Sequence, residues 1–375
     1  MSPTASGLYS AEAAVSYRAV VLVGGGHAHL GVLERAPAFR QRGARLILID
    51  PGRFWYSGRA AGLLGGRFSP DEASIGLAAL AQRRGAAHVA AKVTDLDRAK
   101  RRVHLSDGSA LPYDFVSFAI GSRTHSPWPL DDVAIAGVKP VGTLVRLRER
   151  LLAERPGRIV VIGDGASAAE ITGNLLHLLQ ATSCAVTLIG AAPRLLPGVP
   201  AGLATMVERS LAGRGADIRL GLPVKTIKAS GAVLADGSCI AADRVIVATG
   251  LEAEPLVSGL GLPTQDSGLL VDATLRSVAD ERVFSAGDCA ALAGHRLPKL
   301  GVYGVREAPV LSDNLLAALD GGPLRAYRPQ RHALAILDLA DGRGYAARGR
   351  LWWHGRSALR LKSWLDGRFL ARYRA

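Results

Sequence analysis

The sequence Val21-Leu22-Val23-Gly24-Gly25-Gly26-His27-Ala28-His29-Leu30 places three glycines between an apolar segment and a predicted helix. In a dinucleotide-binding turn, the first glycine permits a tight change of direction, and the second lets a pyrophosphate approach the backbone at a helix N-terminus. Gly24 and Gly26 take these two positions. His29 stands where the third glycine is expected, and we expect its side chain to turn outward. The stretch therefore predicts an α/β domain that binds a dinucleotide.

The segments that follow this turn have the order that such a domain requires. Residues 18–23 predict a buried strand, the residues after Gly26 predict a helix, and residues 45–50 predict a second strand that ends in Asp50. Asp50 follows Gly24 at a distance close to the spacing of about 20 residues at which a carboxylate binds the ribose. The alternative for Asp50 is a plain turn residue before Pro51.

A second glycine turn occurs in the middle of the chain. The apolar residues 158–162 are followed by Gly163-Asp164-Gly165, and Ala168 takes the third small position. One such pattern is weak on its own, whereas two in series indicate two domains of one plan. The repeat predicts an α/β fold with two Rossmann-like domains, each with three layers and a mostly parallel sheet.

Each glycine turn is accompanied by a predicted β-meander. Asp107-Gly108 and Asp236-Gly237 lie between short apolar segments, which is a strong hairpin signal. In both copies a later strand ends 14 residues after the aspartate, at Gly121 or at Gly250. A further short strand, residues 282–286, precedes Gly287-Asp288 and is expected to return beside the first turn.

Composition excludes several classes of protein. The chain has 375 residues, 49% of them hydrophobic, and a formal net charge of +14. The three cysteines lie far apart, so neither a disulfide framework nor a zinc spacing is present, and a reducing, cytoplasmic setting fits. His27 and His29 lack further ligands, and no metal site is expected.

The positive charge comes without a nucleic-acid recognition motif, and no nucleic-acid partner is expected. No apolar run reaches the ~18 residues needed to cross a bilayer.

The basic residues concentrate at the C-terminus. Residues 343–375 hold nine Lys or Arg against one acid, and apolar side chains recur every four residues from Leu361 to Tyr373. This pattern predicts a basic amphipathic helix within residues 331–375. Two alternatives remain open for it: the helix lies on the inner face of the cell membrane, or its apolar side packs back on the protein.

Five motifs in order carry a resemblance to a known family. They are Gly-x-Gly at 24–26, Ala-Ile-Gly at 119–121, Gly-x-Gly-x-x-Ala-x-Glu at 163–170, Ala-Thr-Gly at 248–250 and Ala-Gly-Asp at 286–288. Together they cover roughly residues 18–320 and resemble the FAD-dependent pyridine nucleotide-disulfide oxidoreductases, most closely the type II NADH dehydrogenase-like flavoproteins. The turn at 24–29, Tyr56-Ser57-Gly58, residues 299–306 and the basic tail are similar to the flavin module found fused to selenide, water dikinase.

The resemblance implies a domain plan and two cofactors. A flexible leader at 1–17 would precede a discontinuous FAD-binding domain at 18–125 and 258–330, an NAD(P)H-binding domain at 126–257, and a basic C-terminal region at 331–375. FAD would be the bound cofactor, with NADH or NADPH as its reductant. The implied cofactor contacts are Gly24, Gly26, His27, Ala28, His29, Asp50, Val93, Ala119, Ile120, Gly121, Gly163, Gly165, Ala168, Gly250, Gly287, Asp288, Gly301 and Val302.

The same resemblance implies the residues near the chemistry. Glu170 would lie close to the nicotinamide, and Tyr303 and Arg306 would belong to the helix that begins beside the flavin. A first-turn helix acid is the alternative for Glu170, and a turn cap is the alternative for Asp288. The aromatic residues at 54–56 could cover the flavin ring.

The preference between NADH and NADPH is left open by the sequence. The predicted strand at 185–189 ends in Gly190, where an NAD site would carry an acid. Arg194 could reach a 2′-phosphate or could cap a helix.

The expected activity is transfer of hydride from NAD(P)H to FAD and of electrons from FAD to a second acceptor. The resemblance implies a quinone as the leading acceptor. The absence of a Cys-x-x-Cys or Cys-x-x-x-x-Cys pair agrees with it, and Cys289 is interpreted as a small core residue. The alternatives are a reductase of a small redox protein and an FAD-binding regulatory module with little turnover. The membrane surface and a second copy of the chain, in a homodimer, are further candidate partners.

Overall fold

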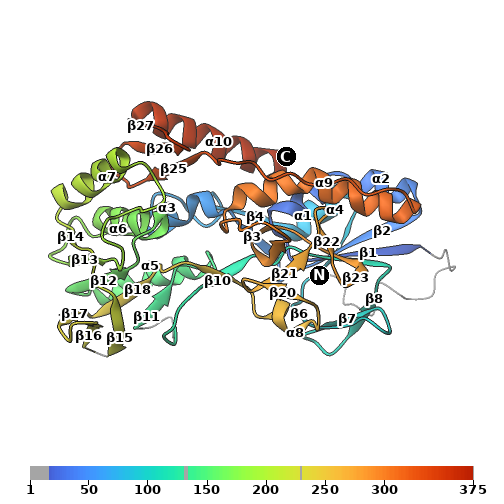
Figure 1. The fold of residues 1–375 in the computed structure, drawn as a ribbon, viewed down its shortest axis with the longest axis horizontal. Coiled ribbons are helices and arrows are strands. Elements are labelled where there is room, and N and C mark those ends of the chain that lie inside the picture. The colour runs from blue at the N-terminus through green and yellow to red at the C-terminus, as the bar shows by residue number, and fades with distance from the viewer. Residues whose placement is uncertain (1–16, 131–133, 229, 375) are drawn as a thin grey trace.

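The computed structural model describes residues 17–130, 134–228 and 230–374, so the predicted leader lies outside it except for Tyr17. Two α/β units lie side by side, and the C-terminal helix crosses the top of the molecule from the second unit to the first (Figure 1). Each unit has a mostly parallel central sheet and a separate small antiparallel meander. The predicted fold class is therefore confirmed.

The first unit is built on a large sheet whose strands come from both ends of the unit. These strands are β1 (Arg18–Val23), β2 (Ala44–Ile49), β5 (Ala87–Val89), β9 (Phe115–Phe118), β20 (Thr264–Gln265), β21 (Gly268–Val271), β22 (Arg276–Ser277), β23 (Asp280–Ser285) and β24 (Ala290–Leu292). The order is β20-β21-β22-β23-β9-β1-β2-β5, with β24 paired to β21. Because β23 pairs in parallel with β9, which pairs in parallel with β1, the late strand returns beside the first glycine turn.

Helices and small strand pairs surround this sheet. They are α1 (His27–Glu34), α2 (Ala36–Gln41), α4 (Leu77–Arg84), α8 (Leu256–Gly259), α9 (Gly301–Asp320), the hairpin β3 (Arg53–Trp55) with β4 (Ser74–Gly76), and the meander β6 (Val93–Asp97), β7 (Arg102–Leu105) and β8 (Ala110–Pro112). The short helix α3 (Ala60–Leu64) instead packs against helices of the second unit. After Arg18, β1 is apolar to its end, because both faces of the central parallel strands are covered. Its residues from Ala19 to Val23 are accordingly buried.

The second unit repeats this plan in a smaller form. Its elements are β11 (Ile135–Gly137), α5 (Thr143–Glu154), β12 (Arg158–Ile162), α6 (Ala166–Leu178), β13 (Ala185–Ile189), α7 (Ala201–Gly213), β14 (Asp217–Arg219), β18 (Arg244–Val247) and the meander β15 (Val224–Lys228), β16 (Gly231–Leu234) and β17 (Cys239–Ala241). The parallel sheet has the order β11-β18-β12-β13-β14. Two antiparallel strands, β10 (Ser122–Thr124) and β19 (Leu251–Ala253), connect the units.

The C-terminal region spans both units. It consists of β25 (Ala335–Asp338), β26 (Gly344–Arg348), β27 (Leu351–Gly355) and α10 (Arg356–Arg374). Leu337 and Tyr345 belong to the core of the second unit, whereas Leu370 and Tyr373, near the end of α10, belong to the core of the first. Part of the predicted amphipathic helix therefore packs back on the protein.

Candidate functional site

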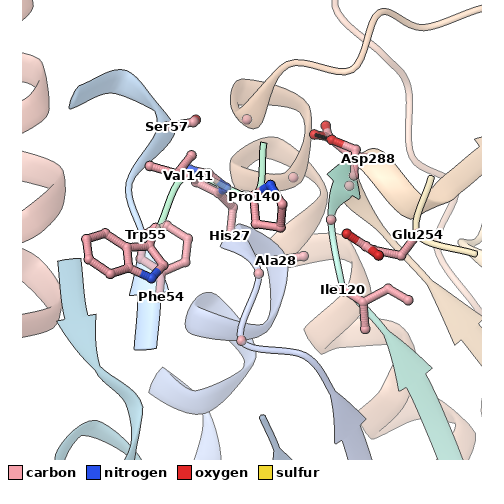
Figure 2. A pocket seen from close by; sticks show the side chains of 18 of the residues that line it. His27, Ala28, Phe54, Trp55, Ser57, Ile120, Pro140, Val141, Glu254 and Asp288 are labelled. Atoms are coloured by element: carbon pink, nitrogen blue, oxygen red, sulfur yellow. Dashed lines mark hydrogen bonds between the residues drawn. The ribbon is translucent and has the colours of Figure 1, made fainter. Parts of the chain in front are cut away.

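A cavity lies where the first glycine turn, the end of β9 and the end of β23 meet (Figure 2). It has a volume of about 190 Å³ and is called the cofactor cavity below. Parallel strands bring their carboxyl ends to one edge of a sheet, which is where α/β domains bind their ligands. The predicted contacts that line this cavity are Gly26, His27, Ala28, Asp50, Ala119, Ile120, Gly121, Gly287, Asp288 and Gly301.

Backbone contacts at the glycine turn explain its residue types. Gly24 has a φ of +83°, which a glycine adopts without strain. A Cβ on Gly26 would lie 2.3 Å from the carbonyl oxygen of Ala119, so only glycine allows α1 to approach β9 so closely. Gly26 is the N-cap of α1 and provides no side-chain cap. The first amide groups of α1 are thus left to bind a ligand at the cavity wall.

The expected outward orientation of His29 is wrong. Its side chain is fully buried between α1 and β9. Nδ1 lies 2.6 Å from the carbonyl oxygen of Gly24, and Nε2 lies 2.8 Å from the hydroxyl of Ser117. Because a carbonyl can only accept, the proton resides on Nδ1. Burial lowers the pKa of His29 to about 4, so the neutral imidazole locks the turn to the sheet from behind.

Asp50 lies in the cofactor cavity at the end of β2. Its Oδ2 accepts from the amide of Gly25 at 2.9 Å, and its Oδ1 accepts from the amide of Gly52 at 2.8 Å. Burial raises the pKa of this carboxyl, and the two amide hydrogen bonds oppose that shift. The carboxylate therefore faces the glycine turn, where a ribose hydroxyl would be in reach.

An ion pair between the two units also lines the cavity. Lys139, which follows β11 in the second unit, donates from Nζ to Asp288 Oδ2 at 2.8 Å and to the Ser122 hydroxyl at 2.9 Å. Burial alone would raise the pKa of Asp288, but the Lys139 ammonium and the hydrogen bonds from Lys139 and Ser122 hold it below its usual value. Asp288 is thus more than a turn cap, since its charge is fixed by a side chain of the other unit.

Aromatic rings form one wall of the same cavity. His27 meets Phe54 edge to face with centroids 4.8 Å apart, and Tyr56 stacks on Phe369 of α10 at 4.9 Å. Phe54 and Trp55 line the cavity, whereas Tyr56, the third residue of the predicted aromatic cover, does not (Figure 2). Burial lowers the pKa of His27 to about 4, so the ring beside the cavity is neutral.

A second, larger opening lies between the two units. This interdomain groove has a volume of about 1060 Å³ and runs from the second glycine turn, at Gly165, to Tyr303 at the start of α9. Residues 196–200 of the second unit and residues 295–298 of the first form its sides. Of the predicted contacts of the second dinucleotide, Gly165 lines this groove, whereas Gly163 in the turn and Ala168 in α6 do not.

Glu170 faces a separate small cavity of about 70 Å³. Its Oε1 accepts from the amide of Asp338 at 2.9 Å. Burial raises the pKa of Glu170 to about 7, and the charge of Lys362 on α10 opposes that shift. Ser57 and Lys139 line both this cavity and the cofactor cavity. A carboxyl that exchanges its proton near neutral pH thus lies next to the predicted flavin site.

Some predicted contacts are not brought to these openings. Arg306 is exposed on α9, Gly250 is exposed after β18, and Val93 lies in the β6–β8 meander. Residues that the sequence did not single out take part instead: Arg53, Ser122, Lys139, Pro140, Val141 and Glu254 line the cofactor cavity. They come from short strands and connecting segments between the motifs, where no local pattern marks them.

Comparison with known proteins is consistent with this geometry. Residues 18–308 match the model of the pyridine nucleotide-disulphide oxidoreductase family. The chain is 28% identical to the type II NADH:quinone oxidoreductase of Haemophilus influenzae, with 48% of this chain and 44% of that protein covered. It is 32% identical to the nitric oxide reductase FlRd-NAD(+) reductase of Vibrio vulnificus, with 57% of this chain and 54% of that protein covered. The matches thus span about half the length of these relatives.

The fold extends further than the sequence similarity. The sulfide:quinone oxidoreductase of Aquifex aeolicus superposes with a TM-score of 0.81 at 18% identity, and 95% of this chain and 91% of that chain are covered. The cofactors of the matched family are FAD and NAD(P)H. Since the family model matches most of the chain, including both glycine turns, this protein belongs to the pyridine nucleotide-disulphide oxidoreductase family.

Proposed function

We propose that this protein carries electrons from NAD(P)H through bound FAD to a second acceptor, with a quinone as the leading acceptor. One observation carries the proposal. Gly301 and Gly304, at the start of α9, line the cofactor cavity, and Tyr303 between them lines the interdomain groove. Two dinucleotides in these openings would meet at one helix N-terminus, whose dipole favours negative charge.

The residues of the cofactor cavity fit FAD. The glycine turn and the uncapped N-terminus of α1 suit a pyrophosphate, and the Asp50 carboxylate suits a ribose. Asp288, held by Lys139, would accept from hydroxyl groups between these ends. FAD supplies two-electron chemistry, while the protein supplies position and electrostatics.

The interdomain groove is the proposed site of NAD(P)H. Gly165 would contact its pyrophosphate at the start of α6, and the nicotinamide end would point toward Tyr303. Glu170, with a pKa raised to about 7, would hold or release a proton next to the site of transfer. The small cavity at Glu170 shares Ser57 with the cofactor cavity, which supports this role.

The cysteines favour an acceptor other than a disulfide. Cys184, Cys239 and Cys289 are all free thiols. Cys289 is fully buried near the cofactor cavity, and burial raises its pKa. A buried thiol of high pKa is a poor nucleophile, and no second cysteine stands beside it. A quinone needs no such pair.

An exposed apolar surface supports a quinone acceptor, which would be drawn from a membrane. Large apolar side chains are exposed on β27 and on the outer side of α10, among arginines; they are Leu351 (75% exposed), Trp352, Trp353, Trp364 (55% exposed) and Leu365. We call these five residues the apolar patch. Arg356, Arg360 and Arg368 are exposed on the same helix. Exposed aromatic residues among cations suit an anionic membrane interface, and we place the protein on the cytoplasmic face of the cell membrane. Among the described residues, no helix is long and apolar enough to span a bilayer.

A second candidate function is reduction of a small redox protein. The same basic surface would attract an acidic carrier protein. A regulatory FAD-binding module, as in the fusion with selenide, water dikinase that the motifs at 24–29 and 299–306 resemble, is the third reading.

Rapid mixing of the FAD-loaded protein with NADH or NADPH under anaerobic conditions tests the proposal. Bleaching of the flavin absorption followed by reoxidation with a soluble quinone analogue is the expected result. Bleaching without reoxidation by the quinone, but with reoxidation by a small iron-sulfur protein, would transfer the assignment to the second candidate. Absence of bleaching with both nucleotides would leave only the regulatory module.

A further inference from the structure

The two glycine turns correspond to one another residue by residue. The amide of Gly24 donates to the carbonyl of Ile49 at 2.8 Å, and the amide of Gly163 donates to the carbonyl of Ile189, also at 2.8 Å. Ile49 and Ile189 are the last residues of β2 and β13, which pair in parallel with β1 and β12. The residue that follows β2 is therefore equivalent to the residue that follows β13. In the same way, the middle residue of the first turn is equivalent to the middle residue of the second.

These equivalent positions carry exchanged residue types. In the first unit, the middle position of the turn is Gly25 and the position after the strand is Asp50. In the second unit, the middle position is Asp164 and the position after the strand is Gly190. The missing acid after β13 is thus matched by an extra acid in the facing turn.

The exchanged carboxylates reach equivalent backbone amides. Asp50 Oδ1 accepts from the amide of Gly52, which lies two residues after Asp50, at 2.8 Å. Asp164 Oδ2 accepts from the amide of Ala192, which lies two residues after Gly190, at 2.9 Å. A carboxylate therefore occupies the same place in both units. In the first unit it comes from the residue after the strand, and in the second it comes from the glycine turn.

Packing explains why the exchange is reciprocal. A Cβ on Gly190 would lie 2.9 Å from the Cβ of Asp164 and 2.8 Å from a methyl carbon of Leu220. Real Cβ atoms do not approach this closely, so the side chain of Asp164 fills the space that an acid after β13 would need. Glycine at position 190 consequently makes room for the Asp164 side chain, and the missing acid there does not mean that a carboxylate is lost from the site.

We propose that Asp164 is the ribose-binding carboxylate of the nicotinamide dinucleotide and makes the protein select NADH over NADPH. The inference rests on the proposed function, in which this domain binds NAD(P)H. A carboxylate accepts hydrogen bonds from both ribose hydroxyls, whereas it repels a 2′-phosphate.

The nearby arginines are engaged elsewhere. Arg194 donates from Nη2 to the carbonyls of Pro197 at 2.6 Å and Val199 at 3.1 Å, so it ties the loop before α7. Arg219, at the end of β14, pairs with Asp217 at 2.9 Å. Of the two uses considered for Arg194, the structure therefore places it in its own loop, where it offers no free cation to a 2′-phosphate.

Binding of nucleotide fragments tests this inference without turnover. We would titrate the FAD-loaded protein with ADP-ribose and with 2′-phospho-ADP-ribose in a calorimeter. The wild-type protein is expected to bind ADP-ribose at least tenfold more tightly. Asp164→Asn, which keeps the size and the bond to Ala192 but removes the charge, is expected to lower that ratio at least tenfold. Asp236→Asn, in the β16–β17 hairpin, removes one charge from the same domain and should leave the ratio unchanged.

A reciprocal exchange provides the decisive comparison. Asp164→Gly alone should lose the discrimination, and Asp164→Gly combined with Gly190→Asp should restore it by rebuilding the arrangement of the first unit. Equal affinity of the wild-type protein for both fragments, or an unchanged ratio in Asp164→Asn, would overturn the inference and leave the proposed function intact. Failure of the wild-type protein to bind either fragment would instead refute the nucleotide site itself, and the inference with it.

Discussion

Lys139 and Asp288 form a nearly buried ion pair across the boundary between the two units, with Nζ and Oδ2 2.8 Å apart. Asp288 belongs to the segment that closes the predicted FAD site, whereas Lys139 belongs to the unit of the second dinucleotide. The pair therefore links the geometry of the cofactor cavity to the relative position of the two units.

Replacing Lys139 should destabilise the fold and weaken FAD retention. Lys139→Met leaves the Asp288 carboxylate buried without its cation, which costs about 3 kcal/mol in the free energy of unfolding. Urea unfolding and the flavin-to-protein absorbance ratio measure the two effects. Arg158→Met breaks the exposed pair with Asp243 and serves as the control, with an expected loss below about 1 kcal/mol. Equal losses in the two variants would contradict the assigned role of Lys139.

Removing the imidazole of His29 should lower stability and spare the cofactor site. His29→Ala loses two buried hydrogen bonds and leaves a cavity, and we expect a loss of about 2 to 4 kcal/mol. His29→Asn retains a donor for the Gly24 carbonyl and should recover part of that loss. Because His29 does not line the cofactor cavity, the FAD affinity of the folded fraction should stay within about twofold. A selective loss of FAD in a variant of normal stability would show direct contact instead.

The protein should lose stability in mild acid. Burial lowers the pKa of His29, and likewise that of His27, from the usual 6.5 to about 4 in the folded state. Between these values the unfolded chain binds protons that the folded protein does not, so the stabilisation is complete above pH 6.5 and declines as the pH falls toward 4. Urea unfolding at a series of pH values should show this decline, and His29→Asn should make it shallower. A flat profile between pH 6.5 and 4 in the wild-type protein would be inconsistent with two neutral buried rings.

Acceptor reduction should depend on one ionisation near neutral pH. The pKa of Glu170 is raised to about 7, so its protonated form prevails at pH 6 and its ionised form at pH 8. If the protonated carboxyl serves quinone reduction, the rate should fall about tenfold over this range. Glu170→Gln should abolish the dependence. The pKa of buried Glu307 is also raised to about 7, and Glu307→Gln is the matched control that should retain the inflection.

The apolar patch should govern membrane binding. Trp364→Ser combined with Leu351→Ser should reduce the fraction of protein that sediments with anionic vesicles at least fivefold, because both side chains are more than half exposed. Removal of the whole region from residue 342 would be a poor test, since Leu370 and Tyr373 belong to the core of the first unit. Leu152→Ser, an exposed leucine on α5, is the control. Equal sedimentation of all variants would show that the apolar patch does not bind the membrane.

Sequence alone predicted the elements whose signals are local. Both glycine turns, the two Asp-Gly hairpins and the return of residues 282–286 beside the first turn occur as expected. They were predictable because a tight turn demands glycine and because a strand buried on both faces demands a continuous apolar run. The order of these signals was sufficient for the fold class and for ten of the 22 residues that line the cofactor cavity.

Tertiary structure alone decided which distant side chains meet. The sequence showed that His29 stands where the third glycine of the turn is expected. Only the packing of α1 on β9 decided that its ring points inward to Ser117. Lys139 lies in a segment without a motif, and it reaches Asp288 because the two units are seated against each other. The acid missing at Gly190 looked like a lost contact in the sequence, whereas the crevice holds Asp164 in its place. A sequence pattern determines where strands and turns occur. The position of a carboxylate depends in addition on whether the turn or the strand end that faces it has room for the side chain.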